Sequence, residues 1–213
     1  MLSYFYLTVV LISFLSSLNS FRSSFHVWLK QFSILLGVTF LNECIAILGH
    51  KFWGINTSVI YNIFMLIEFW MYAYYFRQII NILFIQNVLN WFLILFPLYW
   101  EIIIFMPPNS IYKWNSYLVI TGSFFTILFS VSYYYQIFKE NGITNFTLMP
   151  EFWIVTGMIV YYAATLPYFG TLNYLCNHYM SLANLFTIVT KWLDILMYSI
   201  FTYAFLCKTI MKS

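Results

Sequence analysis

Charged residues are scarce in this 213-residue chain: nine are Lys or Arg and six are Asp or Glu, together 7% of the sequence. A soluble domain carries about a quarter charged residues, because its surface must be wetted. The chain is also 63% hydrophobic, with a mean hydropathy of +0.83. A protein with so few charges presents its surface to lipid, so the composition excludes a soluble globular domain.

Cysteine, histidine and basic runs are scarce too. The three cysteines, Cys44, Cys176 and Cys207, form no C-x-x-C pair, so neither a disulfide framework nor a metal site is expected. The three histidines fall at span ends or in loops, where no i, i+4 pair can bind a metal. No run of Lys or Arg exists to meet a phosphate backbone, which excludes nucleic acid as a partner. With no G-x-S-x-G motif either, we predict no catalytic residue, metal or cofactor.

Long apolar stretches fill the chain instead. A helix needs about 20 mostly apolar residues to cross the hydrocarbon core. Residues 81–106 exceed that length, so we interpret 80–87 as an approach to the fourth span. A peripheral first stretch leaves six spans, and re-entry of 80–87 gives eight. We predict an all-α polytopic transmembrane helix bundle, with residues 1–213 forming one domain and seven spans at 3–19, 27–48, 57–76, 88–106, 115–138, 150–169 and 185–207.

The distribution of Lys and Arg between the loops predicts the orientation. One side of the predicted bundle holds only Lys51 and Lys113. Since the more basic side of a membrane protein is cytoplasmic, we expect the C-terminus in the cytoplasm and the N-terminus outside. The Ile-, Asn- and Tyr-rich composition indicates an AT-rich bacterium, so the predicted location is the bacterial inner membrane. The cytoplasmic side holds Arg22, Arg77, Lys139, Lys208 and Lys212, with Lys30 just inside the second span.

Five ionisable residues fall inside the predicted spans: Glu43, Glu68, Glu101, Lys191 and Asp194. Each costs about 2.5–3.5 kcal/mol at a helix centre on insertion scales, so each needs a reason. The helix directions place them in the outer half of the bilayer, with Glu68 near the midplane as their floor. We therefore predict a ligand- or ion-binding polar cavity. In the alternative, each carboxyl is neutral and bonds a Tyr, Asn or Ser of a neighbouring helix, which only stabilises the bundle.

Two spacings refine this hypothesis. Lys191 and Asp194 lie three residues apart on one helix face, so they can pair directly, although Lys191 could also pair with a carboxyl on another helix. On the third span, a stripe of side chains shares the face of Glu68 and lines either a site or the bundle interior. The stripe consists of Tyr61, Met65, Tyr72 and Tyr75.

Two segments carry a resemblance: YNIFMLIEFWMYAYYF at 61–76 and EFWIVTGMIVYYAATLPYF at 151–169. In these the chain resembles small seven-span membrane proteins of Bacteroidota and the seven-transmembrane sensor segments of bacterial histidine kinases. The resemblance implies signal transduction and brings no catalytic residue. Such sensors are fused to a cytoplasmic kinase that this sequence does not contain, so we expect a separate cytoplasmic partner.

Three functions are compatible with these observations. The first is a sensor or accessory module, which signals to a cytoplasmic partner docked on the loops around Arg22, Arg77 and Lys139. The second is a channel, transporter or pore-forming effector that uses the intramembrane carboxylates, acting as a homo-oligomer. The third is an intramembrane lipid-modifying enzyme with Glu68 or Asp194 as acid–base, and because neither His nor a metal set supports it, we expect no enzyme. In every case the lipid bilayer is a partner.

Overall fold

The computed structural model describes residues 2–22, 25–106, 110–139 and 146–210, and no strand occurs in these ranges. Seven of the helices that they contain are long and apolar enough to cross a membrane. The protein is therefore an all-α integral membrane protein with seven candidate spans, as the composition predicts. The helices are α1 (Leu2–Ser17), α2 (Asn19–Arg22), α3 (Val27–Trp53), α4 (Thr57–Ile79), α5 (Leu83–Phe105), α6 (Ser116–Lys139), α7 (Pro150–His178) and α8 (Met180–Ile210), with 3-10 turns at Ser110–Tyr112 and Phe146–Leu148.

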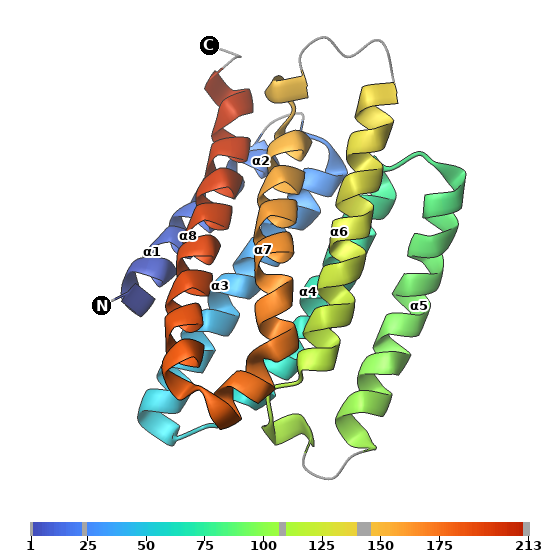
Figure 1. Ribbon diagram of the computed structural model, residues 1–213. Helices are drawn as coiled ribbons and strands as arrows, with labels where there is room; N and C mark the ends of the chain where they lie inside the picture. The colour runs from blue at the N-terminus through green and yellow to red at the C-terminus, as the bar shows by residue number, and fades with distance from the viewer. Residues whose placement is uncertain (1, 23–24, 107–109, 140–145, 211–213) are drawn as a thin grey trace.

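The long helices run side by side along the bundle (Figure 1). At the end drawn at the bottom of Figure 1, called the lower end below, α3, α5 and α7 end and α4, α6 and α8 begin. At the opposite or upper end, α4 and α6 end, α5 and α7 begin, and α8 finishes. Helix α1 begins part-way along the bundle and packs against α3 and α8.

Four helix boundaries differ from the sequence prediction by five residues or more. Helix α3 continues beyond Leu48 to Trp53. Helix α5 begins at Leu83, because the break after α4 is confined to 80–82, where Gln136 accepts a hydrogen bond of 2.6 Å from the Asn81 N–H. Helix α7 continues beyond Phe169 to His178, and α8 already begins at Met180. Hydropathy marks where an apolar stretch ends, whereas backbone hydrogen bonding continues through the polar residues that follow it.

Asn62 fixes the connection between α5 and α6 at the lower end. Its side-chain amide donates hydrogen bonds of 2.9 Å to the Ile111 carbonyl and 2.8 Å to the Lys113 carbonyl. The backbone carbonyl of Asn62 accepts a hydrogen bond of 2.7 Å from the Trp100 indole. Because Asn62 is fully buried, these bonds satisfy polar groups that have little access to water. The arrangement places Trp114 at the base of the bundle.

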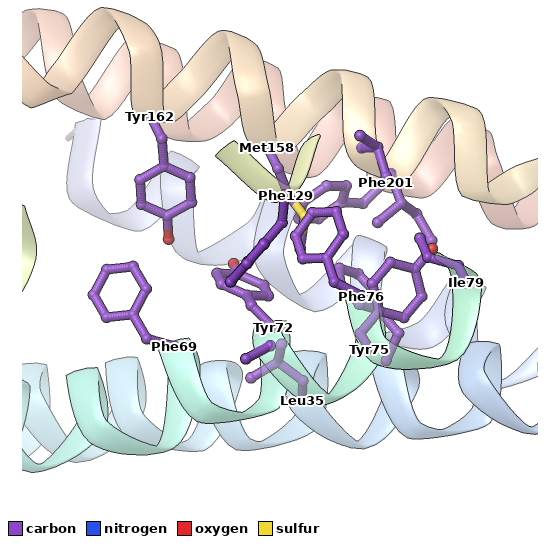
Figure 2. Packing of buried hydrophobic residues seen from close by; sticks show 14 of the residues in the cluster. Leu35, Phe69, Tyr72, Tyr75, Phe76, Ile79, Phe129, Met158, Tyr162 and Phe201 are labelled. Atoms are coloured by element: carbon purple, nitrogen blue, oxygen red, sulfur yellow. The ribbon is translucent and has the colours of Figure 1, made fainter. Parts of the chain in front are cut away.

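Aromatic side chains fill the interior toward the upper end. Phe32 of α3 contacts Phe201 of α8 edge to face, with ring centroids 5.1 Å apart, and Phe76 of α4 lies 5.8 Å from Phe129 of α6. Figure 2 shows Tyr75, Phe76, Phe129 and Phe201 packed between the helices. These fully buried rings leave the upper half of the bundle closely packed.

Candidate functional site

A cavity of about 350 Å³ lies in the lower half of the bundle. Its wall takes side chains from α1, α3, α4, α6, α7 and α8, together with Trp114 from the α5–α6 connection. Known small-molecule sites have volumes of about 300–1,000 Å³, so the cavity has the size of a site for a small ligand. We call it the polar pocket.

Four of the five ionisable residues singled out from the sequence line the polar pocket: Glu43, Glu68, Lys191 and Asp194. Glu101 does not, because it is exposed on α5, which contributes no described side chain to the wall. Depth along a helix follows from sequence position, but the face that a residue presents depends on packing. The structure thus brings together four groups from α3, α4 and α8.

Glu68 lies at the deepest part of the pocket, on the side that faces the upper half of the bundle, and we call this part the floor of the pocket. The hydroxyls of Tyr72 and Tyr162 each donate a hydrogen bond of 3.2 Å to Glu68 Oε1. The two tyrosine rings lie 5.9 Å apart, and Figure 2 shows Tyr162 extending from α7 toward Tyr72 and Phe69 of α4. Glu68 therefore joins α4 to α7, at the level where the pocket meets the aromatic core.

Glu43 occupies the α3 side of the pocket and is only 8% exposed. The Tyr61 hydroxyl of α4 donates a hydrogen bond of 3.1 Å to Glu43 Oε2. The Tyr6 hydroxyl of α1 also interacts with this carboxyl. Glu43 of α3 thus contacts α4 through Tyr61 and α1 through Tyr6, and all three residues line the pocket.

Lys191 and Asp194 lie on α8, and the side chain of Lys191 hydrogen-bonds another helix. Its Nζ donates a hydrogen bond of 3.0 Å to Ser3 Oγ of α1. Asp194 interacts with the Tyr161 hydroxyl of α7. The i, i+3 spacing places both side chains on one face, yet the long lysine side chain reaches across to α1, which the spacing alone does not reveal.

The predicted stripe on α4 runs from the pocket into the core. Tyr61 and Met65 line the pocket, and Tyr72 bonds Glu68 at its floor. Tyr75 lies deeper, with its ring 5.1 Å from that of Phe32. One helix face therefore serves both as site wall and as bundle interior, the two alternatives that the sequence left open.

Aromatic wall residues were missed by the sequence analysis. Tyr162 continues the buried face of α7 after Ile154 and Met158, at spacings of four, so helical periodicity carried a signal for it. Trp114 lies in the α5–α6 connection, where no periodicity exists. Its ring packs 6.1 Å from that of Tyr61 and 5.9 Å from that of Phe169.

A further buried carboxyl, Glu151, lies at the upper end, far along α7 from the pocket residues. It is 7% exposed and accepts a hydrogen bond of 2.8 Å from the Trp28 indole of α3. It stands in the first turn of α7. We interpret it as a link between α3 and α7.

The chemistry of the wall suits binding. Three carboxyls, one ammonium and several phenol rings surround the pocket, and its described lining contains neither His nor Cys. Nor do the described residues contain any group of three or more His, Cys, Asp or Glu side chains that could bind a metal ion. No protein-family model, no curated protein and no solved structure matches the chain, so its function has to be argued from this pocket.

Proposed function

We propose that the protein is a membrane receptor module, which binds a small molecule in the polar pocket and signals to a separate protein at the upper end of the bundle. One observation carries this proposal: a single pocket takes wall residues from six of the seven candidate spans. A molecule bound there contacts most of the bundle at once. Its binding energy can therefore favour one helix packing over another.

Helix α8 supplies a route from the pocket to the upper end. Asp194, Tyr198, Phe201 and Phe205 follow one another at spacings of four, three and four, which places them on one helix face. The first two line the pocket, and Phe201 packs against Phe32 in the core. A shift of α8 caused by a ligand beside Asp194 would repack this row.

Charge supports the orientation that the proposal needs. Lys51 and Lys113 lie at the lower end, whereas Arg77 and Lys139 lie at the upper end, where α8 also finishes. With Arg22 and Lys208 added from the sequence, the upper end is the more basic and is assigned to the cytoplasm. The pocket then lies in the outer half of a bacterial inner membrane, and the partner docks on the inner side.

The packed core favours a receptor over a pore within one chain. An ion path through the bundle would have to cross the level of Phe32, Phe76, Phe129 and Phe205, all of which are fully buried. A pore would then have to form between copies of the chain. The described lining contains neither His nor Cys, so it offers no Ser–His or Cys–His pair of the kind that activates a nucleophile in many hydrolytic enzymes.

Purification from the native membrane tests the proposal. A C-terminally tagged protein is isolated gently, and the proteins and small molecules that accompany it are identified by mass spectrometry. We expect a cytoplasmic protein and a small molecule, with the latter reduced about tenfold in Glu68→Gln, because a charged hydrogen bond is worth about 1.5–3 kcal/mol. The matched control Glu101→Gln, outside the pocket, should retain it.

Recovery of the protein alone as a homo-oligomer, with no molecule that depends on Glu68, would contradict the receptor proposal. Conductance of the purified oligomer in planar bilayers would then test the pore-forming function.

A further inference from the structure

We infer that the polar pocket takes a small molecule with a positively charged nitrogen, a primary or quaternary ammonium on an apolar body. The inference rests on the proposed receptor function and names the class of its ligand. Charge, aromatic rings and the spread of the carboxyls each support it.

The charges of the wall call for a cation. Three carboxyls line the pocket but only one ammonium, and that ammonium, Lys191 Nζ, is engaged with Ser3 of α1. Carboxylates held together in a poorly hydrated pocket repel one another and lose hydration. A bound cation relieves both effects.

The carboxyls also keep acceptor capacity for a ligand. The hydroxyls of Tyr72 and Tyr162 both bond Oε1 of Glu68, so neither of them occupies its Oε2. Glu43 accepts from Tyr61 on Oε2 and also interacts with Tyr6. A carboxylate has two oxygens and about four acceptor positions. The remaining oxygens can accept N–H bonds from a primary ammonium or face a quaternary one.

Aromatic rings stand beside these carboxyls. Tyr61, which bonds Glu43, lies 6.1 Å from Trp114, and Trp114 lies 5.9 Å from Phe169. All three rings line the pocket. Ring faces attract a cation placed within about 6 Å of their centroid, and cages of such rings bind quaternary ammonium groups.

The spread of the carboxyls separates an organic cation from a metal ion. Calcium needs oxygen ligands at about 2.3–2.6 Å and magnesium at about 2.0–2.1 Å, which requires the carboxyls to converge on one point. Within the described residues no such convergent group exists. A cavity of about 350 Å³ with separate carboxyls on α3, α4 and α8 instead fits a molecule of several heavy atoms.

Two sources supply an ammonium of this kind: a soluble amine and the headgroup of an aminophospholipid. The wall includes Thr187 of α8, which is exposed, so the pocket reaches the surface of the bundle. The chemistry at the pocket is the same for both sources, and the test below distinguishes them.

The test uses the purified protein in nanodiscs made only of phosphatidylglycerol, which has no amine. Choline is titrated against its neutral isostere 3,3-dimethylbutanol, and hexylammonium against hexanol. Binding is followed by the tryptophan fluorescence that is lost in Trp114→Phe, and independently by the midpoint of thermal unfolding. We expect at least one cation to bind about tenfold more tightly than its neutral counterpart.

Variants connect this preference to the wall. Glu68→Gln and Asp194→Asn should each weaken cation binding about tenfold, whereas Glu101→Gln should leave it unchanged. The midpoint of thermal unfolding of each variant without ligand shows whether it is folded. If one of the two pocket variants is misfolded, the binding measured with the other one tests the inference. Replacing half of the lipid by phosphatidylethanolamine should weaken choline binding if the lipid headgroup is the natural ligand, and leave it unchanged if a soluble amine is.

Two results would overturn the inference: neutral isosteres that bind as tightly as the cations, or cation binding that survives both pocket substitutions. Tight binding of a neutral probe that depends on Glu68 would rule out the inference of a cationic ligand but would leave the receptor proposal standing. The receptor proposal fails separately, in the purification experiment, if no molecule depends on Glu68.

Discussion

Glu68 performs two tasks that can be separated by substitution. Its carboxyl accepts hydrogen bonds from two tyrosines, and it also presents charge to the pocket. A glutamine keeps an acceptor oxygen in nearly the same place but has no charge. An alanine removes the acceptor altogether.

We therefore predict that Glu68→Ala lowers the free energy of unfolding by about 1–3 kcal/mol, because the hydroxyls of Tyr72 and Tyr162 lose their acceptor. Glu68→Gln should cost clearly less. Thermal unfolding in nanodiscs measures both, with the exposed Glu101→Ala as control. Equal losses for Ala and Gln would show that the charge itself stabilises the fold.

Gly122 of α6 allows the floor of the pocket to form. A Cβ atom at this position would lie 2.3 Å from Phe69 Cδ2, closer than any real contact. Phe69 in turn packs 5.7 Å from the Tyr162 ring and lines the pocket. Only a glycine lets α6 approach α4 this closely.

Gly122→Ala should destabilise the protein by about 1–3 kcal/mol, the usual cost of overpacking a core. It should also weaken ligand binding, because Phe69 has to move. Gly170→Ala is the matched control, since its Cβ would meet only Ile120 Cδ1 at 3.9 Å. In the double variant Gly122→Ala/Phe69→Leu, the smaller leucine side chain should make room for the added methyl group. If this variant is no more stable than Gly122→Ala, the explanation is wrong.

Sequence reasoning located the carboxyls because charge is rare in apolar spans and position along a helix gives depth. It did not separate Glu101 from Glu43, because the two residues have similar predicted depths and depth does not reveal that Glu43 is buried whereas Glu101 is exposed. Nor did it find Trp114, whose place depends on the hydrogen bonds that Asn62 makes to its neighbours. Contacts between distant segments carry no local signal.

At the scale of the element, the connections determine which residues close the pocket. The α3–α4 turn passes through Gly54 at φ 61°, a left-handed conformation that favours glycine, and Ile55 N–H bonds the Gly49 carbonyl at 3.1 Å. Asn56 then caps α4 by accepting from the Ser58 N–H at 2.9 Å. The α5–α6 connection is held against this turn by asparagine side chains.

Asn62→Leu should therefore lower the free energy of unfolding by about 1–3 kcal/mol, because the carbonyls of residues 111 and 113 lose the donor that the buried Asn62 supplies. The fluorescence of Trp114 should change as well. Asn56→Asp removes a similar amide bond, to the Tyr112 carbonyl, at an exposed site, keeps the oxygen that caps α4, and should cost less. A loss no greater than that of Asn56→Asp would mean that the connection is held by other contacts.

Helix existence and approximate position followed from hydropathy, whereas helix ends did not. The extension of α7 to His178 and the start of α8 at Met180 lie in stretches where polar residues interrupt the apolar pattern. The short break at 80–82 depends on Gln136 of α6, a partner 55 residues away from Asn81. Local composition cannot reveal such a partner.

At the scale of the whole molecule, an odd number of spans separates the two ends of the chain. Lys51 lies at the lower end, and α8 finishes at the upper end. The sequence assigns more basic residues to the upper end than to the lower end, so the rule for basic loops predicts that the upper end faces the cytoplasm.

Reporter fusions at Lys51 and Ser213 should therefore report opposite compartments, with Lys51 outside and Ser213 in the cytoplasm. Alkaline phosphatase and green fluorescent protein give complementary readings of the two sides. Shared compartments would contradict seven spans, and exchanged compartments would place the pocket in the inner leaflet.

The most direct measurement is an experimental structure of the protein purified gently from its own membrane, by crystallography or by cryo-electron microscopy with a bound fiducial. A receptor pocket should contain density for a small molecule in contact with Glu43, Glu68 or Asp194, and this density should be absent from Glu68→Gln. A pocket filled by its own tyrosine side chains, with the same structure in both proteins, would mean that these carboxyls only join the helices.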